Sequence, residues 1–111
     1  MTDPLLPQRP MRRYGYEERE DNLIRIVIPR FTDGFFGRIM KRIAVQTEDR
    51  LNLDALGTYV YRRCDGERTV EEIARGMKEE LGEQAEPVEG RLRLFIQEMF
   101  KRNLITFVRN E

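Results

Sequence analysis

Histidine and tryptophan are absent from this 111-residue sequence, and there is a single cysteine, Cys64. Without histidine the chain lacks the side chain that most often acts as a general base near neutral pH or binds a metal ion. One cysteine can form neither a structural zinc site nor an intrachain disulfide. The Walker A, GxGxxG and GxSxG motifs for phosphate binding and nucleophilic catalysis are also missing. We therefore expect no enzymatic activity, no metal site and no cofactor.

Neither sign of charge is in excess. Twenty basic and twenty acidic residues give a formal net charge of zero, so no overall field attracts nucleic acid or an anionic membrane. No segment approaches the roughly 20 consecutive apolar residues of a membrane span, and the N-terminus lacks the apolar run of a signal peptide. A chain of 111 residues can build one modest core. We expect a single soluble, cytoplasmic domain, and the lone cysteine is compatible with that reducing compartment.

The strongest local signals lie in residues 53–81, which predict two helices joined by a tight turn. Asp54 is placed to cap the first helix, and Thr69 with Glu72 has the spacing of a capping box that begins the second. Asp65-Gly66 between them predicts the turn, because glycine readily takes a positive φ. The apolar faces comprise Leu56, Tyr59, Val60 and Cys64 in the first helix, and Val70, Ile73, Ala74, Met77 and Leu81 in the second.

Two small residues in the first helix carry further expectations. Gly57 costs about 1 kcal/mol relative to alanine inside a helix, which predicts that another backbone or a large side chain comes close to it. Cys64 lies on the apolar face and is interpreted as a small core residue rather than a reactive thiol.

Upstream, the pattern changes to that of strands. Tyr14, Tyr16 and Glu18 alternate with Arg13, Gly15 and Glu17, which is the two-residue period of a strand. Glu20-Asp21-Asn22 is a natural turn, and residues 23–28 after it are rich in β-branched side chains. This predicts a β-hairpin. The second strand should be the central one and should end at Pro29, which cannot donate to a ladder.

The connection from this hairpin to the first helix has two parts. Residues 31–43 have helical spacing interrupted by glycines, so a short helix and a helical loop both remain open. Residues 44–53 predict a third strand, with Leu51 and Leu53 facing inward.

The two ends differ in pattern. Residues 1–11 contain three prolines in a spacing that fits polyproline II and excludes a helix, so we expect a disordered tail. Residues 86–102 predict a third helix with Pro87 at its first position. Its apolar residues are Val88, Leu92, Phe95, Ile96, Met99 and Phe100, with Leu94 off the main stripe, which is more apolar width than one core face requires. Residues 104–108 predict a short terminal strand.

Two segments, LDALG at residues 53–57 and CDGERTVEEI at residues 64–73, resemble the PqqD-like family, the relatives of coenzyme PQQ synthesis protein D. The similarity continues to Leu104 and, more weakly, back to Tyr14. It implies an α+β fold in which a three-stranded antiparallel sheet packs on a winged-helix-like unit of three helices with a short C-terminal strand. Residues 12–111 would then form one domain.

The resemblance also implies a function, which is recognition of the leader segment of a ribosomally made precursor peptide. The leader would add as a strand to the edge of the third strand, a mode known as β-augmentation, and its apolar side chains would enter a cleft beside the third helix. The partners implied are that peptide and a radical SAM or other modifying enzyme, with either a monomer or a homodimer as the assembly. The candidate peptide-binding residues are Val45, Gln46, Thr47, Leu51, Leu92, Phe95, Ile96 and Met99.

Two other interpretations remain open. Three helices and a terminal strand also match a winged-helix DNA-binding protein, whose recognition helix would be residues 86–102. Four basic residues of this segment favour that reading: Arg91, Arg93, Lys101 and Arg102. Three acidic residues of the same helix oppose the approach of phosphates: Glu86, Glu89 and Glu98. A purely structural or dimerisation role is the remaining alternative.

Overall fold

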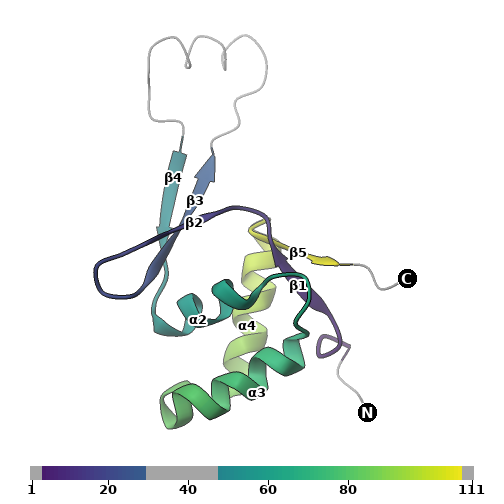
Figure 1. Ribbon diagram of the computed structural model, residues 1–111. Helices are drawn as coiled ribbons and strands as arrows, with labels where there is room; N and C mark the ends of the chain where they lie inside the picture. Colours follow the sequence, from purple (N-terminus) through teal and green to yellow (C-terminus); the bar gives the residue numbers. More distant parts are fainter. Residues whose placement is uncertain (1–3, 30–47, 109–111) are drawn as a thin grey trace, which may run out of the picture.

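The structure is a computed structural model that describes residues 4–29 and 48–108. Within these two ranges it is an α+β fold in which a three-stranded sheet and a two-stranded sheet pack with three helices (Figure 1). In chain order the elements are β1 (Arg9–Arg12), β2 (Tyr16–Glu18), β3 (Ile24–Pro29), β4 (Glu48–Asn52), α2 (Ala55–Arg63), α3 (Val70–Leu81), the 3-10 turn η1 (Gly82–Ala85), α4 (Val88–Lys101) and β5 (Ile105–Val108). The predicted helix or helical loop at residues 31–43 lies outside the described residues.

The three-stranded sheet confirms the predicted hairpin and third strand. Its order is β2-β3-β4, both pairs are antiparallel, and the β-branched strand β3 is central and ends at Pro29. Asn22 takes a φ of 64° in the turn between β2 and β3. Ile24 and Ile26 are fully buried on the face that meets the helices. The β-branched pattern therefore sets the inner face of this sheet.

The helix caps also agree with the sequence. Asp54 Oδ1 accepts a hydrogen bond from the amide of Gly57 at 2.8 Å, and α2 begins immediately after it. At α3 the Thr69 hydroxyl accepts from the amide of Glu72 at 3.1 Å while the Glu72 carboxylate accepts from the amide of Thr69. Gly66 in the intervening turn has a φ of 81°. Short-range spacing determined both helix starts, since each cap involves residues only three apart.

Helix α4 differs from its prediction at the N-terminus. Pro87 is not the first helical residue but the N-cap, with φ −78° and ψ 116°, and the helix begins at Val88. The 3-10 turn η1 follows α3 directly, and both Glu86 and Pro87 after it have extended backbone, so the helix does not include residue 87. The expected surplus of apolar surface is present, because Leu94 is 69% exposed and Phe100 is 50% exposed.

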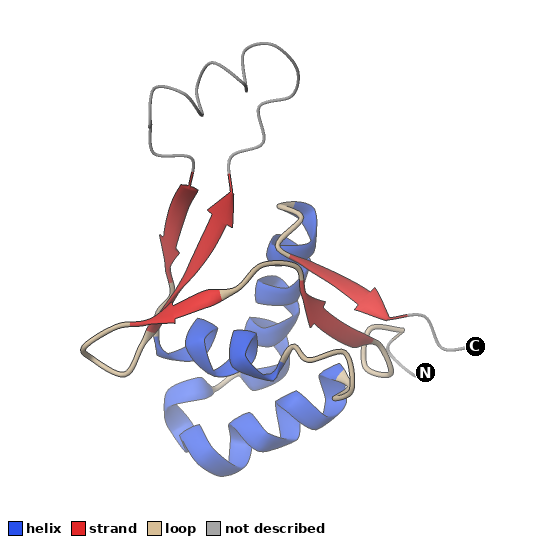
Figure 2. Ribbon diagram, turned by 45° about the horizontal axis from the view of Figure 1, so that its top comes forward, coloured by secondary structure: helices blue, strands red, loops and turns tan. Residues whose placement is uncertain are grey.

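The predicted disordered tail is wrong for residues 4–11. This segment forms a turn and then β1, which pairs antiparallel with β5, so the terminal strand lies beside β1 (Figure 2). The amides of Val70 and Glu71, the first two residues of α3, donate to the carbonyls of Gln8 and Leu6 at 2.9 and 3.0 Å. Proline spacing does favour an extended backbone, but here that extended backbone supplies acceptors to a helix that needs them.

The same segment also contacts the turn between α2 and α3. The amide of Gly66 donates to Pro10, and the amide of Arg12 donates to Cys64, at 2.9 and 2.8 Å. The Arg12 guanidinium donates to the carbonyls of Tyr61 and Arg62, which are among the last carbonyls of α2. A helix leaves its last carbonyls without intrahelical partners, so this arginine completes the C-terminus of α2 from outside.

A hydrogen-bonded tyrosine joins the N-terminal part of the chain to the helices. Tyr61 is fully buried, and its hydroxyl donates to the carbonyl of Tyr14 at 2.7 Å. Burial raises the pKa of this phenol to about 12. Nearby, the amide of Ile24 donates to the hydroxyl of Thr58, which ties the start of β3 to α2. These bonds satisfy polar groups that would otherwise be costly to bury.

Cys64 is fully buried, and its thiol lies 3.2 Å from the carbonyl of Val60. Burial raises the pKa of the thiol to about 12, so the reactive thiolate is scarce at neutral pH. We expect a thiol reagent such as DTNB to label the native protein at pH 7.5 at a rate limited by unfolding. Labelling should become fast in denaturant. Rapid stoichiometric labelling of the folded chain would contradict the buried position.

Candidate functional site

Strand β4 is one of the two outer strands of the three-stranded sheet, β2 being the other, and β3 and β4 extend as a ribbon away from the helices (Figure 1). The amide of Leu53 donates to the carbonyl of Ile24 at 3.0 Å, and Leu51 pairs with Ile26 in the same register. Along a strand, successive residues direct their backbone amide and carbonyl alternately toward one neighbouring strand and away from it. Because Leu51 and Leu53 face β3, the amide and carbonyl of Asn52 are directed away from β3. In the described part of the chain no strand pairs with that outer edge.

An apolar wall lies at the inner face of β4. Leu51 and Leu53 share this face with Ile26; Leu51 is half-buried and Leu53 is buried. The ring of half-buried Phe95 on α4 reaches the same place, because a Cβ added at Gly57 would lie 3.1 Å from Phe95 Cε2 and 3.2 Å from the Leu53 Cβ. The close approach predicted at Gly57 is therefore confirmed. It brings the C-terminal end of β4 and α4 together.

The eight predicted peptide-binding residues fall into three groups. Leu51 and Phe95 are half-buried at the wall just described. Leu92, Ile96 and Met99 are at most 5% exposed and belong to the hydrophobic core. Val45, Gln46 and Thr47 lie outside the described residues. The structure thus brings Phe95 close to Leu53, just after β4, whereas Leu92, Ile96 and Met99 lie in the core. Peptide binding by this set stays a prediction.

A charged cluster on the outer face of the sheet did not emerge from the sequence. Glu17 on β2 pairs with Arg25 on β3 and with Arg50 on β4, at 3.8 and 2.9 Å. Arg25 and Val27 are two residues apart on β3, so their side chains lie on the same face of the sheet. Val27 lies directly opposite Arg50 on β4, and Arg25 lies directly opposite Glu17 on β2, so all three charged residues share that face. The cluster depends on the register of three strands. The sequence pattern predicted the strands but not this register.

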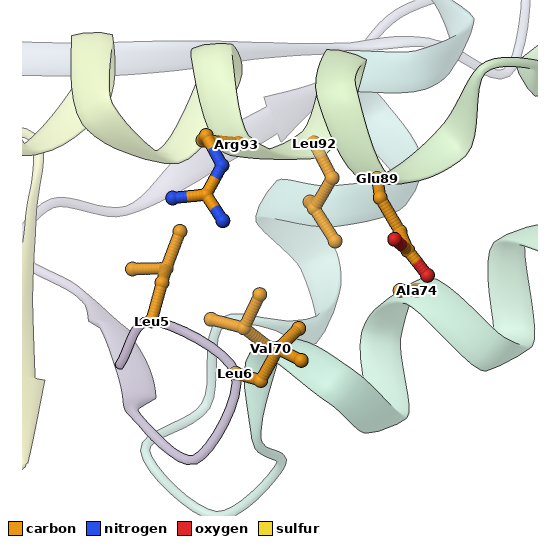
Figure 3. A pocket seen from close by; sticks show the side chains of 7 residues that line it. All are labelled: Leu5, Leu6, Val70, Ala74, Glu89, Leu92 and Arg93. Atoms are coloured by element: carbon orange, nitrogen blue, oxygen red, sulfur yellow. The ribbon is translucent and has the colours of Figure 1, made fainter. Parts of the chain in front are cut away.

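A second surface feature is a small pocket between α3, α4 and the N-terminal segment (Figure 3). In this view Leu5, Leu6 and Val70 lie on the lower side of the pocket, and Arg93 and Leu92 of α4 lie on the upper side. Ala74 and Glu89 complete the lining of the pocket. Leu5 and Leu6 also pack against the hydrophobic core. This place is therefore already covered by the chain's own N-terminal segment.

The described residues contain no group of three or more histidine, cysteine, aspartate or glutamate side chains able to hold a metal ion. Over the same residues, none of the helices combines the length and apolar character needed to cross a membrane. The chemistry that this region offers is backbone hydrogen bonding along a strand edge, an apolar wall beside it and one charged cluster.

These features define a class of small α+β domain, in which a unit of three helices supports a three-stranded sheet whose outer strands in the described residues are β2 and β4. The family model for coenzyme PQQ synthesis protein D (PqqD) matches residues 43–105, more than half of the chain, and the protein belongs to the PqqD family. No curated protein and no solved structure matches it significantly. Membership of the family supports a role associated with the biosynthesis of coenzyme PQQ or of another product made by modifying a ribosomally made peptide.

Proposed function

We propose that this protein is a peptide-binding module that recognises the leader of a ribosomally made precursor peptide and presents it to a modifying enzyme, such as a radical SAM enzyme. The leader adds as a fourth strand to the outer edge of β4, beside Phe95 of α4. The observation that carries the proposal is the combination of an outer strand with a half-buried apolar wall at its inner face. Family membership supports the same role.

The physical basis is β-augmentation. Backbone amides and carbonyls of an edge strand supply affinity that depends little on the ligand's sequence, and side-chain pockets supply the choice of ligand. Every second residue of an added strand faces the same side of the sheet. Alternate leader residues would therefore meet Leu51 and Phe95, and the residues between them would lie on the outer face.

The test uses a proline at the outward-facing position Asn52. Asn52→Pro removes one amide donor from the outer edge and leaves the inward-facing amides of Leu51 and Leu53 in place. We expect it to weaken leader binding by about fivefold or more, which is the value of roughly one net hydrogen bond. The matched control is Asn52→Ala, which removes the side chain but keeps the amide.

Binding is measured by nuclear magnetic resonance titration with the precursor peptide encoded nearest to this protein's gene. The wild type and Asn52→Ala should show shifts along β4 and around Phe95. Shifts confined to α2 and α3, or equal affinities for the proline and alanine variants with both folded, would refute the β4 site. A structural or dimerisation role would then remain.

The DNA-binding alternative gains no support from α4. On this helix Arg102 is paired with Glu98 at 2.9 Å, and Arg91 donates to the carbonyl of Gln84 at 2.7 Å. Basic side chains engaged in this way are less available to phosphates. Titration with salt distinguishes the two functions, because phosphate contacts produce a steep loss of affinity as salt rises and backbone pairing does not.

A further inference from the structure

We infer that the outer edge of β5 is a self-association surface, which pairs antiparallel with β5 of a second copy of this chain. The inference goes beyond the proposed function, because β5 and β4 belong to different sheets and the two contacts use different edges. Within the described residues β5 pairs with β1 alone, and Figure 1 and Figure 2 show both strands at the periphery of the molecule.

Strand β5 has no charged residue along its edge. On the outer strands of the other sheet, β2 carries Glu17 and Glu18. Strand β4 carries Asp49 and Arg50. Charges of this kind discourage pairing between edge strands. The sequence of β5 is ITFV, in which every residue is β-branched or aromatic, so this edge is suited to pairing with a further strand.

Two residues of β5 direct their backbone groups toward the outer edge. Phe107 and Ile105 lie opposite Pro10 and Arg12 of β1. The carbonyl of Pro10 and the amide of Arg12 do not face β5, because they bond to the turn after α2 at 2.9 and 2.8 Å. Facing residues of an antiparallel pair alternate between exchanging both backbone hydrogen bonds and exchanging none. The amides and carbonyls of Ile105 and Phe107 therefore point away from β1.

The strand is complementary to itself in this orientation. A twofold axis at Thr106 places Ile105 of each copy opposite Phe107 of the other, and each such pair can exchange both of its backbone hydrogen bonds. The two Thr106 residues then face each other across the axis. Cross-strand pairs of an aromatic with a β-branched residue, and of threonine with threonine, are both favourable. The four residues of the strand bring no like charges together.

An exposed aromatic ring lies beside the same edge. Phe100 on α4 is 50% exposed, and its ring centroid lies 5.1 Å from that of Phe107. Phe107 shares one face of β5 with the buried Ile105, since the two are two residues apart. A second copy related by an axis perpendicular to the sheet presents the same face, so its strand would cover part of the Phe100 ring. Such an apolar surface beside an unpaired strand favours association.

Sedimentation of the full chain at increasing concentration measures the association. We expect a reversible monomer–dimer equilibrium with a dissociation constant on the order of 0.1 mM, because strands of four residues form a small interface. The weight-average mass should rise from 13.3 kDa toward twice that value. Hydrogen exchange at the amides of Ile105 and Phe107 should slow over the same concentration range.

A pair of charge variants tests the register. Thr106 is half-buried and lies opposite the exposed Met11. Thr106→Glu and Thr106→Lys each bring two like charges together across the axis, so each alone should associate at least about tenfold more weakly than the wild type. An equimolar mixture of the two variants brings opposite charges together and should restore the dimer. The matched control makes the same two changes at Gln84, an exposed residue beyond the other end of α4, and should leave the association unchanged.

Three results would overturn the inference: a wild type that stays monomeric at about 1 mM, charge variants that dimerise as well as the wild type, or a mixture of folded variants that does not associate. Spectra of each variant show whether it is folded. If either variant fails to fold, the exchange rates in the wild type decide, because rates at Ile105 and Phe107 that do not depend on concentration exclude this edge. Loss of leader binding at β4 has no bearing on these results, so the two proposals can fail separately.

Discussion

Replacing Ile73 by alanine is expected to lower the free energy of unfolding by about 2 to 5 kcal/mol, the range for large-to-small substitutions in a packed core. Ile73 is 1% exposed on the inner face of α3, and it belongs to the cluster that joins all three helices. The substitution removes apolar contacts and leaves a cavity that the surrounding side chains can fill only partly. A loss of this size is a large fraction of the stability of a small domain.

Chemical denaturation monitored by circular dichroism measures this loss, with Leu94→Ala as the matched control. Leu94 is 69% exposed on α4, so its truncation should change the stability by no more than about 0.5 kcal/mol. Equal midpoints for the Ile73→Ala variant and the wild type would show that Ile73 is not a core residue. Phe95→Ala should fall between the two, because Phe95 is only half-buried.

Removal of residues 1–12 is expected to destabilise the protein by about 3 kcal/mol or more. The deletion eliminates the acceptors for the amides of Gly66, Val70 and Glu71, and each such hydrogen bond contributes about 1 kcal/mol. It also removes the β1 ladder with β5 and the apolar cover that Leu5 and Leu6 give to the core. A disordered tail, in contrast, could be removed at no cost.

The control is a shorter deletion of residues 1–3, which leaves these contacts in place. If the longer deletion fails to fold, hydrogen exchange in the intact protein gives the same information. The amides of Val70 and Glu71 should be protected although they belong to the first turn of a helix, where amides lack intrahelical partners. Rapid exchange at both positions, or an unchanged melting temperature after the longer deletion, would show that the N-terminal segment is not bound.

The sequence by itself determined the elements whose causes are local. Thr69 and Glu72 are three residues apart, as are Asp54 and Gly57, so their mutual hydrogen bonds could be predicted from spacing. The apolar face of α3 and the β-branched run of β3 are likewise patterns of a single element. The glycine at position 57 even predicted a close neighbour, without saying that the neighbour was Phe95.

Only the tertiary structure decided the contacts between distant parts of the chain. Proline spacing at the N-terminus indicates an extended backbone but contains no information about β5, with which that backbone pairs. Gly76 lies inside α3, and only the fold shows that the Tyr59 hydroxyl occupies the place of a Cβ there. The cluster at the β4 edge has the same origin, because Glu17, Arg25 and Arg50 meet through the register of three strands. Local spacing determines hydrogen bonds within a turn of helix, whereas strand partners are chosen by the burial and pairing of the whole fold.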